Sequence, residues 1–260
     1  MANEINIKSS TIEKGLDIAK DFLTKILGPT ADEFGLYLAD NIKYFRFKNQ
    51  LKILLKAQNY IDKNNINIKE VPMKILVPLL EKASLEENEE LQDKWSNMIA
   101  NLVDSEQNMQ NQIFPHLLSQ ISMDEYTELK GLNKEENKHL FDKTKLKNLR
   151  DELDKSKYSS PEIDKLQSQV TDREQQGFII ILDSYEKSNL IRLGLIKELP
   201  PRIYLEDSRR WTNNRGEINL DNIEPMYDTD DTMGYRITEL GEKFLQICEI
   251  NKNVNNQDQL

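Results

Sequence analysis

Cysteine and histidine, on which many catalytic and metal sites depend, are scarce in this chain. Among its 260 residues are one cysteine, Cys248, and two histidines, His116 and His139. A single cysteine excludes an intramolecular disulfide and favours a reducing compartment. No pair or cluster of His and Cys has zinc-ligand spacing, and neither histidine follows an arginine at the spacing of a helical ribonuclease motif. We therefore expect Cys248 to lie in the core and both histidines to be structural or solvated.

Glycine is also rare, and long apolar runs are missing. Nine glycines leave little material for nucleotide-binding loops, and the P-loop, dinucleotide-binding and nucleophile-elbow motifs are all absent. The longest apolar runs, 75–80 and 178–182, are far shorter than the ~20 residues of a membrane span, and the N-terminal residues do not form a signal peptide. We expect a cytoplasmic protein without a cofactor. Enzymatic activity stays open, although no catalytic constellation supports it.

The charge balance is acidic, with 45 Asp and Glu against 35 Lys and Arg and a formal net charge of -10. This balance argues against a broadly basic nucleic-acid surface, so any phosphate contact must be local. One local candidate is the basic and aromatic stretch that contains Lys43, Arg46, Lys48, Lys52 and Lys56. It suits a phosphate backbone or an anionic membrane, but we favour a solvated helix face. The acidic run 228–232 lacks the glycine that a calcium loop needs, so we expect no metal there.

Hydrophobic periodicity predicts helices through the first half of the chain. The expected helices cover 10–27, 31–62, 72–80, 85–103, 113–121 and 123–130. Ser84 to Glu87 and Ser122 to Glu125 have the spacing of capping boxes before two of them, and Pro78 should kink or shorten the helix that contains it. Residues 1–132 are therefore interpreted as an N-terminal multi-helix domain.

Residues 133–177 change in character, because charged and amide side chains dominate. Sparse apolar residues recur at helical spacing in two groups: Leu146, Leu149 and Leu153, then Ile163, Leu166 and Val170. Ser160 and Pro161 mark the start of the second helix. We predict a projecting antiparallel helical hairpin through which the protein meets a partner or itself, with a passive insertion as the alternative. Its second arm should continue into 178–182 and become buried on all sides.

The C-terminal third predicts a helix, a strand, a wing, a returning strand and a last helix. Gly194 supplies the left-handed residue at the end of a helix, and an extended apolar run follows it. Residues 235–237 alternate as the returning strand does, and Thr238 caps a helix that carries Phe244 and Cys248 on its apolar face. This pattern predicts a winged-helix-like module with a small β-hairpin over 178–250, followed by a polar tail, 251–260. The expected fold class is thus mainly α.

Two groups of side chains in this module are candidate contacts with nucleic acid or a partner. The wing supplies Arg209, Arg210, Trp211 and Arg215, and the helix before it supplies Lys187, Asn189 and Arg192. Guanidinium groups and an indole can grip phosphates, but base recognition would need several bidentate donors on the helix. Acidic residues flank both groups. We favour protein contact over specific DNA binding and keep both open.

Several short segments carry a resemblance to a known family. They are Leu27 to Gly35, Phe45 to Lys48, Val71 and Pro72, Pro78 to Glu81, Ala83 to Glu86, Trp95 to Asn101, Asn189 to Ile196, and Leu240, Gly241, Phe244 and Cys248. Through them, residues 27–102 and 189–248 resemble the bacterial Abi-alpha family, named for abortive infection. The resemblance implies a role in phage defence, usually by halting the infected cell, and it implies no particular chemistry. The 133–177 hairpin has no counterpart in the family and looks like an insertion.

Three hypotheses of function follow. The leading one is an antiviral defence protein that acts by binding or sensing. The second is a winged-helix transcriptional regulator that binds DNA and dimerises through the hairpin. The third is a toxin effector that acts at the membrane through the amphipathic helices around residues 26–38, or through an unrecognised nuclease-like activity.

Overall fold

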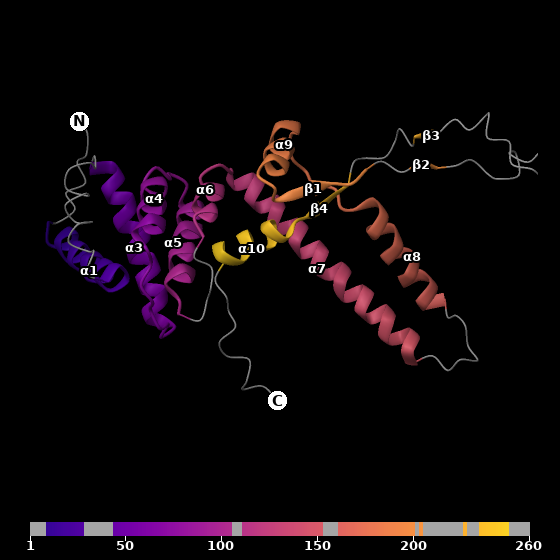
Figure 1. Cartoon of the computed structure of the whole chain (residues 1–260), viewed down its shortest axis with the longest axis horizontal. Coiled ribbons are helices and arrows are strands. Elements are labelled where there is room, and N and C mark those ends of the chain that lie inside the picture. The colour runs from indigo at the N-terminus through magenta and orange to yellow at the C-terminus, as the bar shows by residue number, and fades with distance from the viewer. Residues whose placement is uncertain are drawn as a thin grey trace, which may run out of the picture. The chain divides into compact units, whose positions relative to one another are not determined.

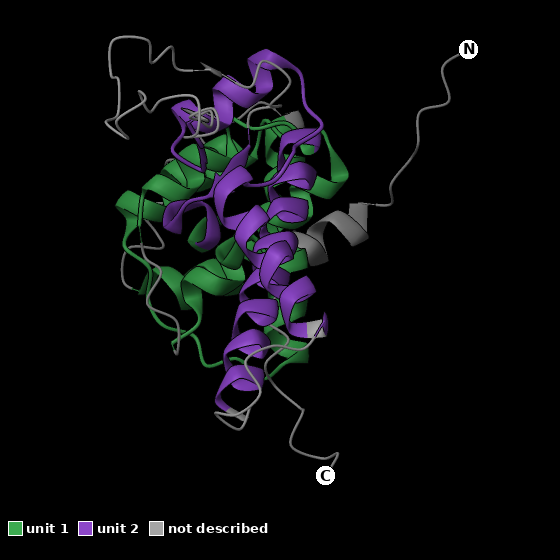
Figure 2. Cartoon of the chain, turned by 90° about the vertical axis from the view of Figure 1, so that its right-hand side faces the viewer, with its two compact units in different colours: residues 1–123, 243–260 green, residues 124–242 purple. Residues whose placement is uncertain are grey.

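The computed structural model describes residues 9–28, 44–105, 111–152, 161–200, 203–204, 226–227 and 234–249. These residues are mainly helical, as the sequence predicts, with a few short antiparallel strands (Figure 1). The chain divides into two compact units: unit 1 contains residues 1–123 and 243–260, and unit 2 contains residues 124–242 (Figure 2). None of the helices in the described ranges has the length and apolar character needed to cross a membrane.

Unit 1 is built from helices that pack around one apolar core. They are α1 (Ser9–Leu27), α3 (Tyr44–Lys63), α4 (Met73–Ala83), α5 (Glu89–Val103), α6 (Ile113–Leu118) and the last residues of α10 (Glu239–Cys248). Helix α3 contacts α1, α4 and α5, and α4 contacts α6. The fully buried side chains include Phe22, Ile53, Leu79, Trp95 and Met98, which belong to the apolar stripes of the predicted helices.

The expected effect of Pro78 on α4 is wrong as far as helix length is concerned. Helix α4 runs from Met73 to Ala83 with Pro78 inside it. Proline has no N–H to donate to the carbonyl oxygen four residues earlier, which belongs to Lys74. That oxygen accepts a hydrogen bond from Gln112 Nε2 at 3.0 Å. A side chain distant in sequence therefore satisfies the acceptor that Pro78 leaves open.

The capping box predicted at Ser84 is also wrong. Helix α5 begins at Glu89, and its N-cap is Asn88, whose side-chain oxygen accepts from the backbone N–H groups of Glu90 and Leu91 at 2.9 and 3.1 Å. Ser84 instead follows the last residue of α4, where its hydroxyl donates to the Glu81 carbonyl at 2.5 Å. Because α4 extends one turn further than predicted, Ser84 lies at its C-terminal end. Asn88, the next residue suited to an N-cap, then begins α5.

The basic residues of α3 make contacts inside unit 1. Lys52 pairs with Glu89 at 2.6 Å, and Lys56 pairs with Asp93. Arg46 donates to the Ser84 hydroxyl at 3.0 Å. These contacts agree with a solvated helix face, whereas a phosphate-binding track would need these cations for its ligand. Lys43 lies outside the described residues.

Unit 2 is organised around a long helix that extends past the end predicted for it. Helix α7 (Met123–Glu152) continues unbroken through residue 130, and α8 (Pro161–Gln176) begins at the predicted proline. The predicted seam is confirmed, since one cluster contains Leu146, Leu149, Ile163, Leu166 and Val170. Leu153 and Ser160 lie outside the described residues. The division of the sequence into 1–132, 133–177 and 178–250 stays a prediction.

The rest of unit 2 consists of one helix and short strands. They are α9 (Ser184–Arg192), β1 (Ile196–Glu198), β2 (Ile203–Tyr204), β3 (Met226–Tyr227) and β4 (Tyr235–Ile237). Strand β1 pairs antiparallel with β4, with Ile196 opposite Ile237, and β2 pairs antiparallel with β3. Gly194 has φ +72°, which lets the chain turn from α9 into β1 as predicted.

The prediction that 178–182 continues the hairpin helix and is buried on all sides is wrong. Helix α8 ends at Gln176, and Gly177 turns the chain with φ +69°. Phe178 then exchanges both backbone hydrogen bonds with Tyr235 of β4, at 3.0 and 2.8 Å. Beyond it the side chains alternate, with Ile180 buried and its neighbours Ile179 and Ile181 exposed. An extended segment points successive side chains to opposite faces, so an apolar run need not be buried throughout.

Thr238 caps α10, as the sequence predicts. Its hydroxyl oxygen accepts from the backbone N–H of Gly241 at 3.0 Å. The same hydroxyl donates to the carbonyl oxygen of Gly194 at 2.5 Å. The threonine therefore joins the first turn of α10 to the turn between α9 and β1.

A group of charged and polar side chains joins β4 to α7. Arg236 donates twice to Glu136, from Nε to Oε1 at 2.9 Å and from Nη2 to Oε2 at 2.8 Å. One turn further along α7, the ring of His139 is buried and lies edge-on to Phe178, with ring centres 6.3 Å apart. Its Nδ1 has no hydrogen-bond partner among the described residues. Burial, and then the charge of Arg236, lower the pKa of His139.

The last turn of α10 ends against α5. The final carbonyl groups of any helix have no partner within the helix. Here Asn101 Nδ2 donates to the carbonyl oxygens of Ile247 and Glu249 at 2.8 and 2.9 Å, and Asn97 Nδ2 donates to that of Cys248 at 3.1 Å. The side chain of Asn101 is buried. Its amide therefore satisfies carbonyl groups where water has little access.

We expect Asn101→Ala to lower the free energy of unfolding by about 1–3 kcal/mol, because it removes the donor to the buried carbonyl oxygen of Ile247 and to the partly buried one of Glu249. Urea unfolding followed by circular dichroism measures this change. Asn59→Ala is the matched control, since Asn59 is exposed on α3. Equal losses in the two variants would show that the contact with α10 contributes nothing.

The low pKa of His139 predicts a pH dependence of stability. The unfolded chain takes up a proton near pH ~6.5 while the folded chain resists it, so stability is full above that pH and falls as the pH drops below it, by up to about 1.4 kcal/mol per unit. His139→Gln should remove this part of the fall in urea unfolding at a series of pH values. His116→Gln, a change at an exposed histidine, should retain it. Identical slopes in the wild type and His139→Gln would contradict the assignment.

Candidate functional site

The predicted contact residues divide into a described and an undescribed group. Arg209, Arg210, Trp211 and Arg215 lie outside the described residues, so their role stays a prediction. Lys187, Asn189 and Arg192 all lie on α9. The structure therefore describes the candidate site only at α9 and at the segment before it.

The three α9 residues make contacts within unit 2. Asn189 Nδ2 donates to Glu125 Oε1 of α7 at 2.8 Å, and Arg192 Nη2 donates to Asn189 Oδ1 at 2.6 Å. Lys187 Nζ lies 5.9 Å from the centre of the Tyr235 ring. Both ends of the Asn189 amide are thus engaged. A ligand that used this amide would first have to displace Glu125 or Arg192.

Large apolar side chains are exposed on α9 and on the segment before it. We define the α9 surface by four of them: Ile179, Ile181, Tyr185 and Ile191, which are 69%, 84%, 71% and 38% exposed. Single exposed apolar residues are ordinary, whereas contiguous groups of bulky ones mark contact surfaces. Three of these residues, Ile179, Ile181 and Tyr185, lie within seven positions of the chain. None of these four residues is among the contacts predicted from the sequence. The sequence feature that could have indicated them is the apolar run 178–182, which is followed directly by the capped start of α9.

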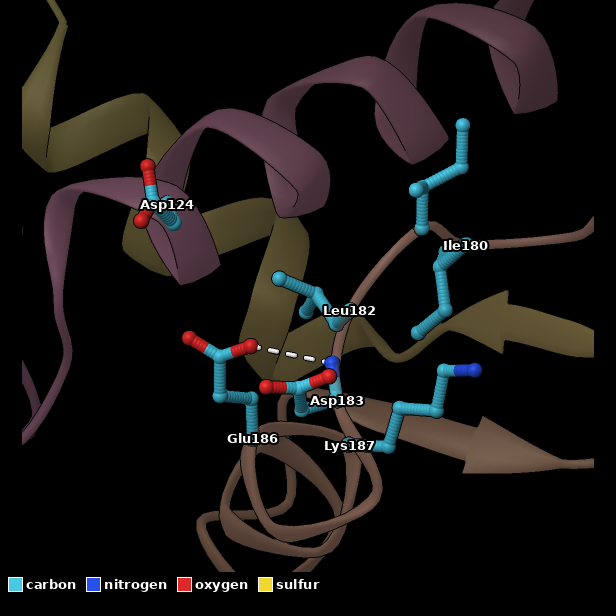
Figure 3. Close-up of a pocket in the computed structure, with 7 residues that line it drawn as sticks. Asp124, Ile180, Leu182, Asp183, Glu186 and Lys187 are labelled. Carbon is cyan, nitrogen blue, oxygen red and sulfur yellow. Dashed lines mark hydrogen bonds between the residues drawn. The ribbon is translucent and has the colours of Figure 1, made fainter.

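A shallow hollow of about 470 Å³ lies within unit 2 at the start of α9 (Figure 3). Its apolar lining comes from the segment before α9, namely Ile180, Ile181 and Leu182, and its charged lining is Asp124, Asp183, Glu186 and Lys187. Glu186 reaches back so that its Oε2 accepts from the backbone N–H of Asp183 at 3.0 Å, the dashed line in Figure 3. This bond caps the first turn of α9 and holds both carboxylates beside the apolar residues.

Carboxylates dominate the electrostatics of the α9 surface. The pKa of the exposed Tyr185 hydroxyl is raised, chiefly by the charge of Glu186 and then by burial, with further contributions from Asp183, Glu125 and Asp124. A negative potential opposes a second negative charge on the phenol, which is why the pKa rises. The potential around Tyr185 is therefore negative.

The groups most often used in metal or thiol chemistry can be examined one by one in the described part of the chain. No set of three His, Cys, Asp or Glu side chains in those ranges is arranged to hold a metal ion. Cys248 is buried, as predicted, and burial raises the pKa of its thiol well above the usual value, which disfavours the reactive thiolate. His116 is exposed and lies against Gln120.

A comparison with protein-family models matches residues 40–248 to the family described as abortive infection alpha. The matched range takes in most of the chain and residues of both units. Comparisons with curated proteins and with solved structures each returned no match. The family inferred from short segments of the sequence is thereby confirmed, whereas the inserted character of the 133–177 hairpin stays a prediction. Because the match extends over far more than half of its length, the chain belongs to the abortive infection alpha family.

Proposed function

We propose that this protein acts in abortive infection, in which a phage-infected bacterial cell is halted, and that it acts by binding another protein through the α9 surface. Membership of the family supports the biological role. The observation that carries the mechanism is the exposure of Ile179, Ile181, Tyr185 and Ile191, of which Ile181 also lines the hollow at the start of α9. Aromatic and aliphatic side chains of this kind are the usual anchors of protein interfaces.

The exposed isoleucines are held in place by the fold of unit 2. Phe178 is bonded to β4 and Ile180 is buried, which leaves Ile179 and Ile181 directed outward. The backbone N–H of Ile181 also donates to Glu128 Oε2 of α7 at 3.0 Å. A partner therefore meets side chains that need little further ordering, which lowers the entropic cost of binding.

The alternative of a winged-helix regulator that binds DNA receives less support. The order α9, Gly194, β1, β4 and α10 agrees with such a module, and the paired β2 and β3 flank the segment that contains Arg209 to Arg215. A helix-turn-helix, however, joins its two helices by a turn of about 3–4 residues. The seven residues 177–183 separate α8 from α9. The carboxylates near Tyr185 would in addition repel phosphates.

The alternative of a membrane effector is supported only weakly by the part of the 26–38 segment that is described. Ile26 and Leu27 are buried in unit 1, and the backbone carbonyl of Ile26 accepts from Val71 N–H at 2.8 Å. A helix that inserted this apolar face into a lipid surface would first have to leave the core of unit 1.

Phage challenge of a sensitive host that expresses the protein tests the proposal. We expect fewer plaques, and collapse of the culture at high multiplicity of infection. The double variant Ile181→Ser with Tyr185→Ser should lose about tenfold or more of the plaque reduction, because it removes two exposed anchors. It should fold normally, since changes at exposed sites alter stability by only about 0.5 kcal/mol.

The matched control is Leu85→Ser with Ile18→Ser, at two exposed apolar residues of unit 1. A further arm, Leu140→Ser with Phe141→Ser, changes exposed residues of α7 and tests the 133–177 hairpin as the contact surface instead. Unchanged plaque numbers with the wild type across a broad phage panel would contradict the defence role. Full protection by the Ile181 and Tyr185 variant would remove the α9 surface from the mechanism.

A further inference from the structure

The start of α9 combines apolar side chains with three carboxylates and one cation. Asp124, Asp183 and Glu186 line the hollow beside Ile180 and Leu182, and no described Lys or Arg forms an ion pair with Asp124 or Asp183. Lys187 also lines the hollow, with its ammonium group 5.9 Å from the Tyr235 ring centre. The net charge of the side chains that line the hollow is therefore negative.

The backbone beside the hollow is suited to an extended ligand. Phe178 directs its N–H and C=O toward Tyr235 of β4. In an antiparallel arrangement the next residue, Ile179, directs its own N–H and C=O to the other side. No strand in the described ranges pairs with that side. On that side the backbone N–H of Ile181 already donates to Glu128 of α7, which leaves the N–H and C=O of Ile179 as the backbone groups that a peptide in extended conformation can meet.

We infer that the partner segment that binds the α9 surface is an extended peptide segment in which apolar side chains are interspersed with Lys or Arg. This inference rests on the proposed function and specifies the chemistry of the partner. Apolar side chains cover Ile179, Ile181 and Tyr185, while the cations face Asp124, Asp183 and Glu186. Phosphate groups of nucleic acid and anionic lipid headgroups are repelled by the same carboxylates. The attraction between the cations of the peptide and these carboxylates acts over about 8 Å at physiological salt, so it selects partners at close range.

Peptides of defined pattern test this inference with the full chain. A fluorescent peptide of alternating Leu and Lys should bind about tenfold more tightly than one of alternating Leu and Glu or of alternating Ser and Lys, as measured by anisotropy. Its affinity should fall as salt is raised, because the charges are exposed. Equal binding of the Leu–Lys and Leu–Glu peptides would overturn the inference.

A triple variant, Asp124→Asn, Asp183→Asn and Glu186→Gln, removes the charges with little change of shape. Asn caps a helix as well as Asp does, and Gln can take the place of Glu in a capping box, so α9 should persist. We expect about a tenfold loss of affinity for the Leu–Lys peptide. The control, Glu87→Gln, Glu135→Gln and Glu242→Gln, changes the net charge equally at exposed sites elsewhere and should bind as the wild type does. Equal losses in the two triple variants would mean that the peptide senses only net charge, which overturns the inference.

Phage challenge of the triple variant separates this inference from the proposed function. Loss of protection together with loss of peptide binding supports both. If the triple variant still protects while the Ile181 and Tyr185 variant does not, the surface is correct and the basic partner is wrong. If the Ile181 and Tyr185 variant still protects, the proposed contact surface and the inference that rests on it both fail.

Discussion

Two asparagines of α5 hold the end of α10, and the organisation of unit 1 depends on them. Residues 124–242 belong to unit 2, so unit 1 must join two stretches that are far apart in sequence. Asn97 and Asn101 do this through directional bonds to the carbonyls of Ile247, Cys248 and Glu249. Apolar packing alone would tolerate a shift of α10 along its axis, whereas amide-to-carbonyl bonds specify which turn meets α5. The opposite end of α10 is capped in unit 2 by Thr238.

The sequence was informative wherever a single residue decides the local backbone. Gly194 turns the chain between α9 and β1, Pro161 begins α8, and Thr238 caps α10, because each effect depends on that residue's own geometry or hydrogen bonding. Predictions from the sequence were wrong where a side chain distant in the sequence determines the local structure. Pro78 does not end α4, since the amide of Gln112 supplies the donor that proline lacks. The rule that proline breaks a helix describes an isolated helix. No residue near Pro78 in the sequence indicates that a distant side chain will donate to the carbonyl that proline leaves open.

The candidate site could be predicted only in part, for the same reason. Lys187, Asn189 and Arg192 were selected as donors on a helix, but the partner of Asn189 is Glu125, which α7 brings from a different part of the chain. His139 was expected to be structural or solvated, and the ring is buried against Phe178, close to Arg236. Exposure of Ile179 and Ile181 follows from the bonds between Phe178 and Tyr235, which set the faces of the segment. Pairing of this kind cannot be read from a run of five apolar residues.

The distribution of charge decides more about function than its total. A net charge of -10 describes the chain as a whole, but in unit 1 the cations of α3 are neutralised by carboxylates of α5, as Lys52 and Glu89 show. At the start of α9 the carboxylates instead lie beside exposed apolar side chains, where they cap the helix and act on Tyr185. Asp183 and Glu186 form the capping box of α9, so the side chains that cap this helix also place negative charge beside the exposed apolar residues. A partner that covers the apolar residues must therefore also accept the negative charge that the cap places beside them.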